Sequence, residues 1–146
     1  MGVTNLVTRS EVVVAASSAE VWPLVEDPND WKLGLKPQHV SGQPGTVGEV
    51  RRASYDHEGA DVWLEIETVA LAVPHRKVIK IQTSAGGSPS WAAWSLADGD
   101  DGTVVTYDVY GEVELADGEA DRYVQDNQRR FDEELLRLKA LVEGQR

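Results

Sequence analysis

The feature that most constrains the fold is a long amphipathic stretch over residues 117–143. Its apolar residues recur three, four or seven positions apart, as on one face of an α-helix; they are Ala120, Val124, Phe131, Leu135, Leu138 and Val142. Asp117 is the expected N-cap, and Gly144 follows the last periodic residue. About 25 residues of helix measure roughly 37 Å, enough to cross a small domain. A helix of this length with a single apolar face needs a sheet to lie on.

Most of the remaining chain has the alternating polar and apolar pattern of half-buried strands. We expect strands over residues 6–16, 47–55, 61–73, 76–83, 90–96 and 103–115, with at most a brief edge strand over 38–41. The short turns between consecutive strands imply antiparallel neighbours. The alternation implies that one face of the sheet is wet and that the long helix covers the other face.

Two short helices are expected after the first strand. Ser17 with Glu20 three residues later forms a capping box, which predicts a helix start at this point. Asp27-Pro28 ends that helix, and a further turn or two should carry Trp31. The predicted order is therefore one strand, two short helices, about six strands in a meander and one long helix.

Length and composition limit the class of protein. The chain of 146 residues fits one domain, over residues 1–146, and it contains no cysteine for a disulfide, a thiolate metal site or a cysteine nucleophile. A net charge of −11 argues against nucleic-acid binding. No apolar run approaches the ~20 residues of a membrane span, and the first residues lack a signal pattern. We expect a soluble, cytoplasmic protein.

Several short motifs mark the ends and junctions of the predicted elements. They are Val14-x-Ala16-Ser17-x-x-x-Val21-Trp22, Asp27-Pro28-x-x-Trp31, Gly45-x-x-Gly48, Pro74-x-Arg76, Trp94-x-Leu96 and Gly102-Thr103-x-Val105-Thr106-Tyr107. In this order and spacing they resemble the START-like or Bet v 1-like superfamily, also called SRPBCC, which includes the polyketide cyclase/dehydrase-like proteins. The resemblance covers essentially the whole chain. It implies an α+β helix-grip fold, in which a curved antiparallel sheet of about six to seven strands wraps around the C-terminal helix and leaves a cavity.

Relatives in this superfamily hold lipids, sterols, plant hormones or polyketide intermediates in that cavity, and some catalyse cyclisation or dehydration. Others act on protein partners, as co-chaperones or ribosome-associated proteins. The superfamily has no universal catalytic signature, so the resemblance transfers no catalytic residue and implies no cofactor. If the protein is an enzyme, we expect proton-transfer chemistry without a cofactor.

The polar clusters of the sequence favour no metal or catalytic site. His39, His57 and His75 stand 18 residues apart in or beside loops, without a spacing that brings two metal ligands together. Asp56-His57-Glu58 has the composition of an acid–base cluster but also that of an ordinary polar turn. We therefore expect no metal site.

Polarity on faces that should point inward gives the candidate site. Asn127 lies in the apolar stripe of the long helix, and Tyr107 and Trp94 lie on apolar strand faces, so each brings a polar group inward. A small-molecule cavity typically has an apolar lining with a few polar anchors. The predicted ligand-binding residues are Leu64, Ile66, Ile79, Trp94, Tyr107, Val109, Asn127, Phe131 and Leu135. The alternative is that these residues pack a dry core, with Asn127 bonded to backbone.

Two function hypotheses follow. The favoured hypothesis is a binding protein for a hydrophobic small molecule of polyketide, aromatic or lipid type, with possible cyclase or dehydratase activity. The other is a protein-interaction module or homodimer that uses the outer sheet face, where Trp63 and Trp91 lie opposite the apolar residues. A cavity of roughly 300 Å³ or more supports the first hypothesis, and a collapsed core supports the second.

Overall fold

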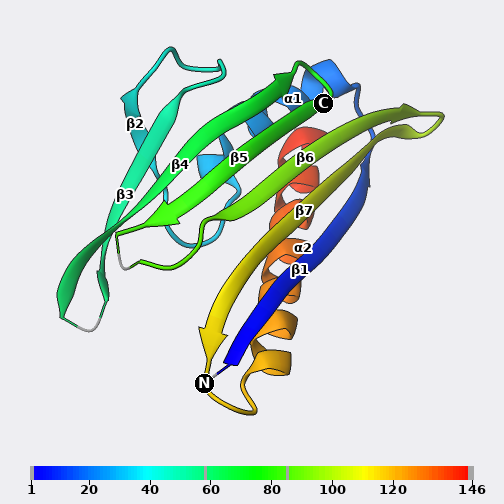
Figure 1. Cartoon of the computed structure of the whole chain (residues 1–146). Coiled ribbons are helices and arrows are strands. Elements are labelled where there is room, and N and C mark those ends of the chain that lie inside the picture. Colours follow the sequence, from blue (N-terminus) through cyan, green and yellow to red (C-terminus); the bar gives the residue numbers. More distant parts are fainter. Residues whose placement is uncertain (1, 58, 85, 145–146) are drawn as a thin grey trace.

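The computed structural model describes residues 2–57, 59–84 and 86–144. Along the chain these form β1 (Gly2–Val14), α1 (Ser18–Glu26), a 3₁₀ turn η1 (Pro28–Asp30), β2 (Gln38–Ser41), β3 (Val50–His57), β4 (Ala60–Ala72), β5 (Arg76–Thr83), β6 (Ser90–Gly99), β7 (Gly102–Leu115) and α2 (Ala120–Gly144). The strands make one antiparallel sheet in the order β1-β7-β6-β5-β4-β3-β2. Figure 1 shows this sheet curving around one face of α2.

Strand β1 forms one edge of the sheet and pairs with β7 along its whole length, from Gly2 opposite Leu115 to Val14 opposite Thr103. It therefore begins four residues earlier than the apolar pattern from Leu6 predicts. Partner backbone groups on β7 order these first residues, which the local sequence does not mark as strand. In β4 the register shifts between Thr68 and Ala70, and such a bulge helps a sheet to bend.

Helix α2 lies along β1, the edge strand of the sheet (Figure 1). The amide of Gln128 donates to the carbonyl of Arg9 over 2.9 Å, and the Lys139 ammonium donates to the carbonyl of Val13 over 2.7 Å. These side chains occupy backbone acceptors that an edge strand otherwise leaves open to another chain. The position of α2 is thus set by the edge of the sheet, and the helix leaves the inner face of β3–β5 less covered.

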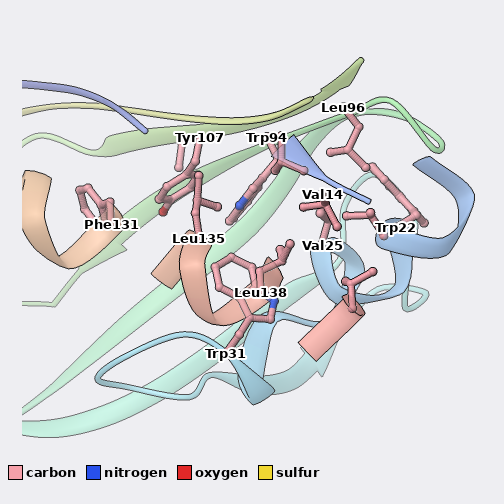
Figure 2. Close-up of a cluster of buried hydrophobic side chains, with 14 of the residues drawn as sticks. Val14, Trp22, Val25, Trp31, Trp94, Leu96, Tyr107, Phe131, Leu135 and Leu138 are labelled. Carbon is pink, nitrogen blue, oxygen red and sulfur yellow. The ribbon is translucent and has the colours of Figure 1, made fainter. Parts of the chain in front are cut away.

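The core lies between α2, α1 and the inner faces of β1, β6 and β7 (Figure 2). Trp31 is completely buried, and its indole N–H donates to the Leu24 carbonyl over 2.7 Å. The inward residues of the strands are those that the alternation predicts. Neither helix of the described chain combines the length and the apolar composition that crossing a membrane requires.

The predicted fold class is confirmed, and so is the capping box. Ser17 Oγ accepts from the amide of Glu20, and the Glu20 carboxylate accepts from the amide of Ser17. The predicted start of the long helix is wrong by three residues, because α2 begins at Ala120. Gly118 adopts φ +85°, a left-handed turn conformation that interrupts the helix, so Asp117 cannot be its N-cap. At the other end Gly144 is the last helical residue rather than the one that follows the helix.

Candidate ligand cavity

A cavity of about 920 Å³ lies between the inner face of the sheet and the N-terminal half of α2, with residues 28–37 along one side. Most of its lining is aliphatic or aromatic. The cavity exists because α2 follows β1 and β7 and has no comparable packing against β3–β5. Its volume falls within the usual range of small-molecule sites, roughly 300–1,000 Å³.

Eight of the nine predicted ligand-binding residues line this cavity; they are Leu64, Ile66, Ile79, Trp94, Tyr107, Val109, Asn127 and Phe131. Leu135 does not belong to the lining. It lies one turn beyond Phe131 on α2 and is buried in the core, with 1 % of its surface exposed. That these residues bind a ligand stays a prediction.

An aromatic wall forms the inner end of the cavity. The rings of Trp94 and Tyr107 stack with centroids 4.7 Å apart and planes at 24°, and Phe131 meets Tyr107 edge-on at 5.3 Å. Figure 2 shows Trp94 and Tyr107 side by side, projecting from the sheet toward α2. Adjacent strands place the two side chains together, because Trp94 of β6 is directly opposite Tyr107 of β7. The pair is a rigid, mainly apolar surface with two polar groups, an indole N–H and a phenol hydroxyl.

An ion pair that the sequence analysis did not find lies beside this wall. The Lys32 ammonium is 3.0 Å from Glu134 Oε1 and 3.3 Å from the Tyr107 hydroxyl, to which it also donates. Glu134 is fully buried, and its other oxygen accepts from the amide of Leu33 over 2.7 Å. Lys32 lines the cavity and keeps about a fifth of its side chain exposed.

Two local features place these charges. Trp31 is anchored by its indole bond to Leu24 and by the Arg137 guanidinium, which donates to the Trp31 carbonyl, so the next residue, Lys32, is held at the cavity wall. Glu134 stands on the buried side of α2, three residues after Phe131. A carboxylate at that position of the apolar stripe is the sequence signal that could have identified the pair.

The environment of Lys32 favours its charged form. Burial acts to lower the pKa of Lys32, but the Tyr107 hydroxyl and the Glu134 carboxylate together raise the pKa above its usual value. The ammonium also lies 5.0 Å from the Tyr107 ring centroid and 5.6 Å from that of Phe131, in reach of both π-faces. Lys32 is therefore a fixed cation at the inner end of the cavity.

A second lysine, Lys77 on β5, lines the cavity and is buried, with 6 % of its surface exposed. Its ammonium donates to the carbonyls of Val25 and Glu26, at the end of α1, over 3.2 Å each. Burial, followed by the nearby Arg51 guanidinium, lowers the pKa of Lys77 to about 8. Lys77 thus caps a helix end while one of its neighbours on the cavity wall is Trp94, 5.8 Å from the ammonium to the ring centroid.

Asn127, predicted as a polar anchor, is already bonded within α2. Its amide nitrogen donates to the Tyr123 carbonyl over 2.8 Å, and its oxygen accepts from Arg130 over 3.3 Å. The side chain lines the cavity and is half-buried. The structure therefore has both the cavity that the ligand-binding hypothesis predicts and the backbone-bonded Asn127 that the dry-core alternative predicts.

The histidines lie in separate surroundings. His39 contacts the Glu49 carboxylate at 3.1 Å, and His75 contacts the Leu96 carbonyl at 3.0 Å. The side chain of His57 and the whole of Glu58 lie outside the described residues, so the Asp56-His57-Glu58 cluster is not described as a unit. Within the described residues, no three His, Asp or Glu side chains gather closely enough to hold a metal ion.

On the outer face of the sheet, Trp91 is exposed and Trp63 is half-buried. The Arg52 guanidinium covers the Trp63 ring at 4.7 Å, and the Lys80 ammonium lies 5.7 Å from the Trp91 ring centroid. The interaction hypothesis therefore loses Trp63 as an exposed contact and keeps Trp91.

A curved antiparallel sheet, a long helix that lies on it and a cavity between the two define a helix-grip protein. The family model described as "Polyketide cyclase / dehydrase and lipid transport" matches residues 6–143. The chain belongs to this family, as the resemblance of its motifs predicts. No curated protein sequence matches the chain.

Several solved structures share the fold. SA2116, a protein of unknown function from Staphylococcus aureus, superposes with a TM-score of 0.76 at 11% identity, covering 98% of this chain and 96% of that one. DynU16, a protein in the dynemicin biosynthetic locus, superposes with a TM-score of 0.68 at 23% identity. The match covers 94% of this chain but only 47% of DynU16. Ara h 8.0201 superposes with a TM-score of 0.67 at 14% identity, and the match covers 98% of this chain and 99% of that one. At these identities the similarities show the fold alone.

Proposed function

We propose that the protein binds a hydrophobic small molecule of polyketide, aromatic or lipid type in the cavity between the sheet and α2. The observation that carries the proposal is the cavity itself, about 920 Å³ with a mostly apolar lining and a cationic inner end. A packed core would leave no such volume. Membership of a family described by polyketide cyclisation, dehydration and lipid transport supports the same class of ligand. A cytoplasmic location remains a prediction.

The first test is native mass spectrometry of the purified protein beside a denatured control. We expect an added mass that is lost on denaturation, and its value narrows the ligand class. A second test uses the neutral fluorophore N-phenyl-1-naphthylamine, whose emission rises in an apolar site. A clean apo mass together with no fluorophore binding would contradict the proposal.

A pair of matched variants locates the binding. Ile66→Trp adds an indole at the half-buried lining of the cavity, whereas Val13→Trp adds the same group on the outer face, where Val13 is 44 % exposed. We expect Ile66→Trp to weaken fluorophore binding at least tenfold and Val13→Trp to leave it unchanged. Urea unfolding of both variants checks that each is folded. Equal effects of the two variants would place the binding outside the cavity.

Cyclase or dehydratase activity is a further proposal for the same cavity. The Tyr107 hydroxyl accepts from the Lys32 ammonium, and a phenol held in this way is a suitable proton donor to a ligand oxygen. Once the ligand is identified, Tyr107→Phe should retain binding and abolish turnover. Unchanged turnover in this variant would exclude Tyr107 as the acid.

The alternative function, self-association through the outer sheet face, is favoured by one observation. Val7, Tyr110 and Trp91 are opposite one another on β1, β7 and β6 and are 64 %, 47 % and 38 % exposed. This row is an apolar surface of the kind that subunits bury. Sedimentation velocity tests it, because a homodimer should dissociate in Trp91→Ser, whereas a strict monomer at high concentration contradicts this alternative.

A further inference from the structure

The inner end of the cavity holds more hydrogen-bond donors than acceptors. The Lys32 ammonium has three N–H groups, of which one points to Glu134 and one to the Tyr107 hydroxyl. Because that hydroxyl accepts from Lys32, its own proton is free to be donated, and no described residue accepts it. The indole N–H of Trp94 is buried and has no partner in the described part of the chain.

The acceptors nearby are already used. Glu134 is the carboxylate that lies behind the inner end of the cavity, and its two oxygens accept from the Lys32 ammonium and from the amide of Leu33. A buried donor that lacks a partner is destabilising, because it has lost its hydrogen bonds to water without gaining another. A group that enters the cavity with a free lone pair can supply the missing acceptor.

We propose that the ligand carries a neutral acceptor oxygen, such as a ketone or aldehyde carbonyl, an inference that rests on the proposed function. Lys32 and Tyr107 hold this oxygen at the inner end of the cavity. Glu134 is the positioning residue, since it holds the ammonium at 3.0 Å without belonging to the cavity lining. Trp94 stacks against Tyr107 with ring centroids 4.7 Å apart and so helps to fix the ring that carries the hydroxyl (Figure 2).

The preference for a neutral oxygen follows from the charges. Glu134 already balances the positive charge of Lys32, and it is fully buried beside the ammonium. A ligand carboxylate at the same place would add a second negative charge next to Glu134, and like charges at close range in a buried site repel strongly. Lys77, another cation of the cavity wall, is already bonded to the carbonyls of Val25 and Glu26. A carbonyl oxygen accepts the same hydrogen bonds without that repulsion.

The test compares three probes of nearly equal shape as competitors of N-phenyl-1-naphthylamine: 2-acetylnaphthalene, 2-ethylnaphthalene and naphthalene-2-carboxylate. In the unmodified protein we expect the ketone to bind about tenfold more tightly than the hydrocarbon, which corresponds to about one net hydrogen bond. The carboxylate should bind less tightly than the ketone. Measurement at several pH values between 6 and 8 keeps the carboxylate ionised throughout.

Variants assign the effect to the named groups. Tyr107→Phe should reduce the preference for the ketone to about threefold, and Lys32→Met should abolish it, while binding of the hydrocarbon persists in both. The matched control is Lys80→Met, which removes a lysine from the outer face of the same sheet, where it contacts Trp91. Lys80→Met should leave all three affinities unchanged. If Lys32→Met does not fold, the nearly isosteric Tyr107→Phe still decides the question.

The outcomes separate the two proposals. Equal affinity for the ketone and the hydrocarbon would overturn the acceptor-oxygen inference and leave the hydrophobic-ligand proposal intact. Tightest binding by the carboxylate would overturn the preference for a neutral oxygen. Failure of all three probes to displace the fluorophore from a cavity that binds it would overturn the inference, whereas failure of the fluorophore itself to bind would count against the proposed function.

Discussion

Breaking the Lys32–Glu134 pair from one side should destabilise the protein more than its separate contacts suggest. In Lys32→Met the fully buried Glu134 carboxylate keeps only the amide of Leu33 as a described donor. Removing one partner of a buried ion pair costs about 3–5 kcal/mol, because the other charge is left uncompensated. Glu134→Gln should cost less, about 1–3 kcal/mol, because the amide oxygen still accepts from Leu33 and Lys32 retains some exposure to water.

The double variant decides whether the two residues act together. Lys32→Met with Glu134→Gln contains no buried unpaired charge, so we expect its cost to fall short of the sum of the single costs by about 2 kcal/mol. Urea unfolding at pH 7, followed by tryptophan fluorescence and circular dichroism, measures the free energy of unfolding of each variant. The control is the same cycle on Arg9 and Asp108, an exposed pair that should show far weaker coupling. Additive costs at Lys32 and Glu134 would refute the reasoning.

Three further predictions concern single positions. Burial lowers the pKa of Lys77 from 10.5 to about 8, so the folded state disfavours the protonated form of this lysine. The free energy of unfolding of the unmodified protein, relative to that of Lys77→Met, should therefore rise by about 3 kcal/mol from pH 8 to 10.5. A difference that does not change with pH would contradict this. Gly102→Ala should prevent stable folding, since the new Cβ would lie 2.0 Å from the Val14 carbonyl oxygen at φ +130°; an unchanged melting temperature would show that this turn adapts. Leu135→Ala should cost about 2–5 kcal/mol in urea unfolding and leave probe affinity within twofold, because Leu135 packs the core outside the cavity lining; a large loss of affinity would assign it to the site.

Local patterns were sufficient for much of the cavity lining. Alternation in β4, β5, β6 and β7 identified the inward residues, and eight of the nine proposed lining residues indeed face the cavity. These inferences succeed because the period of a strand is two, so one buried residue determines the face of the others. Phe131 and Leu135 come instead from the apolar stripe of α2, and a helix stripe does not say where a cavity ends and a core begins.

The charged pair of the site, Lys32 and Glu134, was missed for a physical reason. Lys32 follows a short 3₁₀ turn, where no periodicity indicates the direction of a side chain, and Glu134 is one of many charged residues on a helix that carries both signs of charge. Asn127 is a polar residue in the apolar stripe of α2, yet its amide donates to the Tyr123 carbonyl of the same helix. Polarity at an inward position therefore showed only that a group needs partners, not which partners it has.

The amino-acid sequence by itself determined the kinds of element, their order, the face of each strand and the family to which the chain belongs, because period, capping and turn chemistry act between residues a few positions apart. Tertiary structure alone decided that Lys32, Tyr107 and Glu134 meet, over separations of 75 and 102 residues from Lys32. It also decided that a cavity exists. The bonds of Gln128 and Lys139 to the free edge of β1 hold the helix at one side of the sheet, and the volume left on the other side depends on that placement.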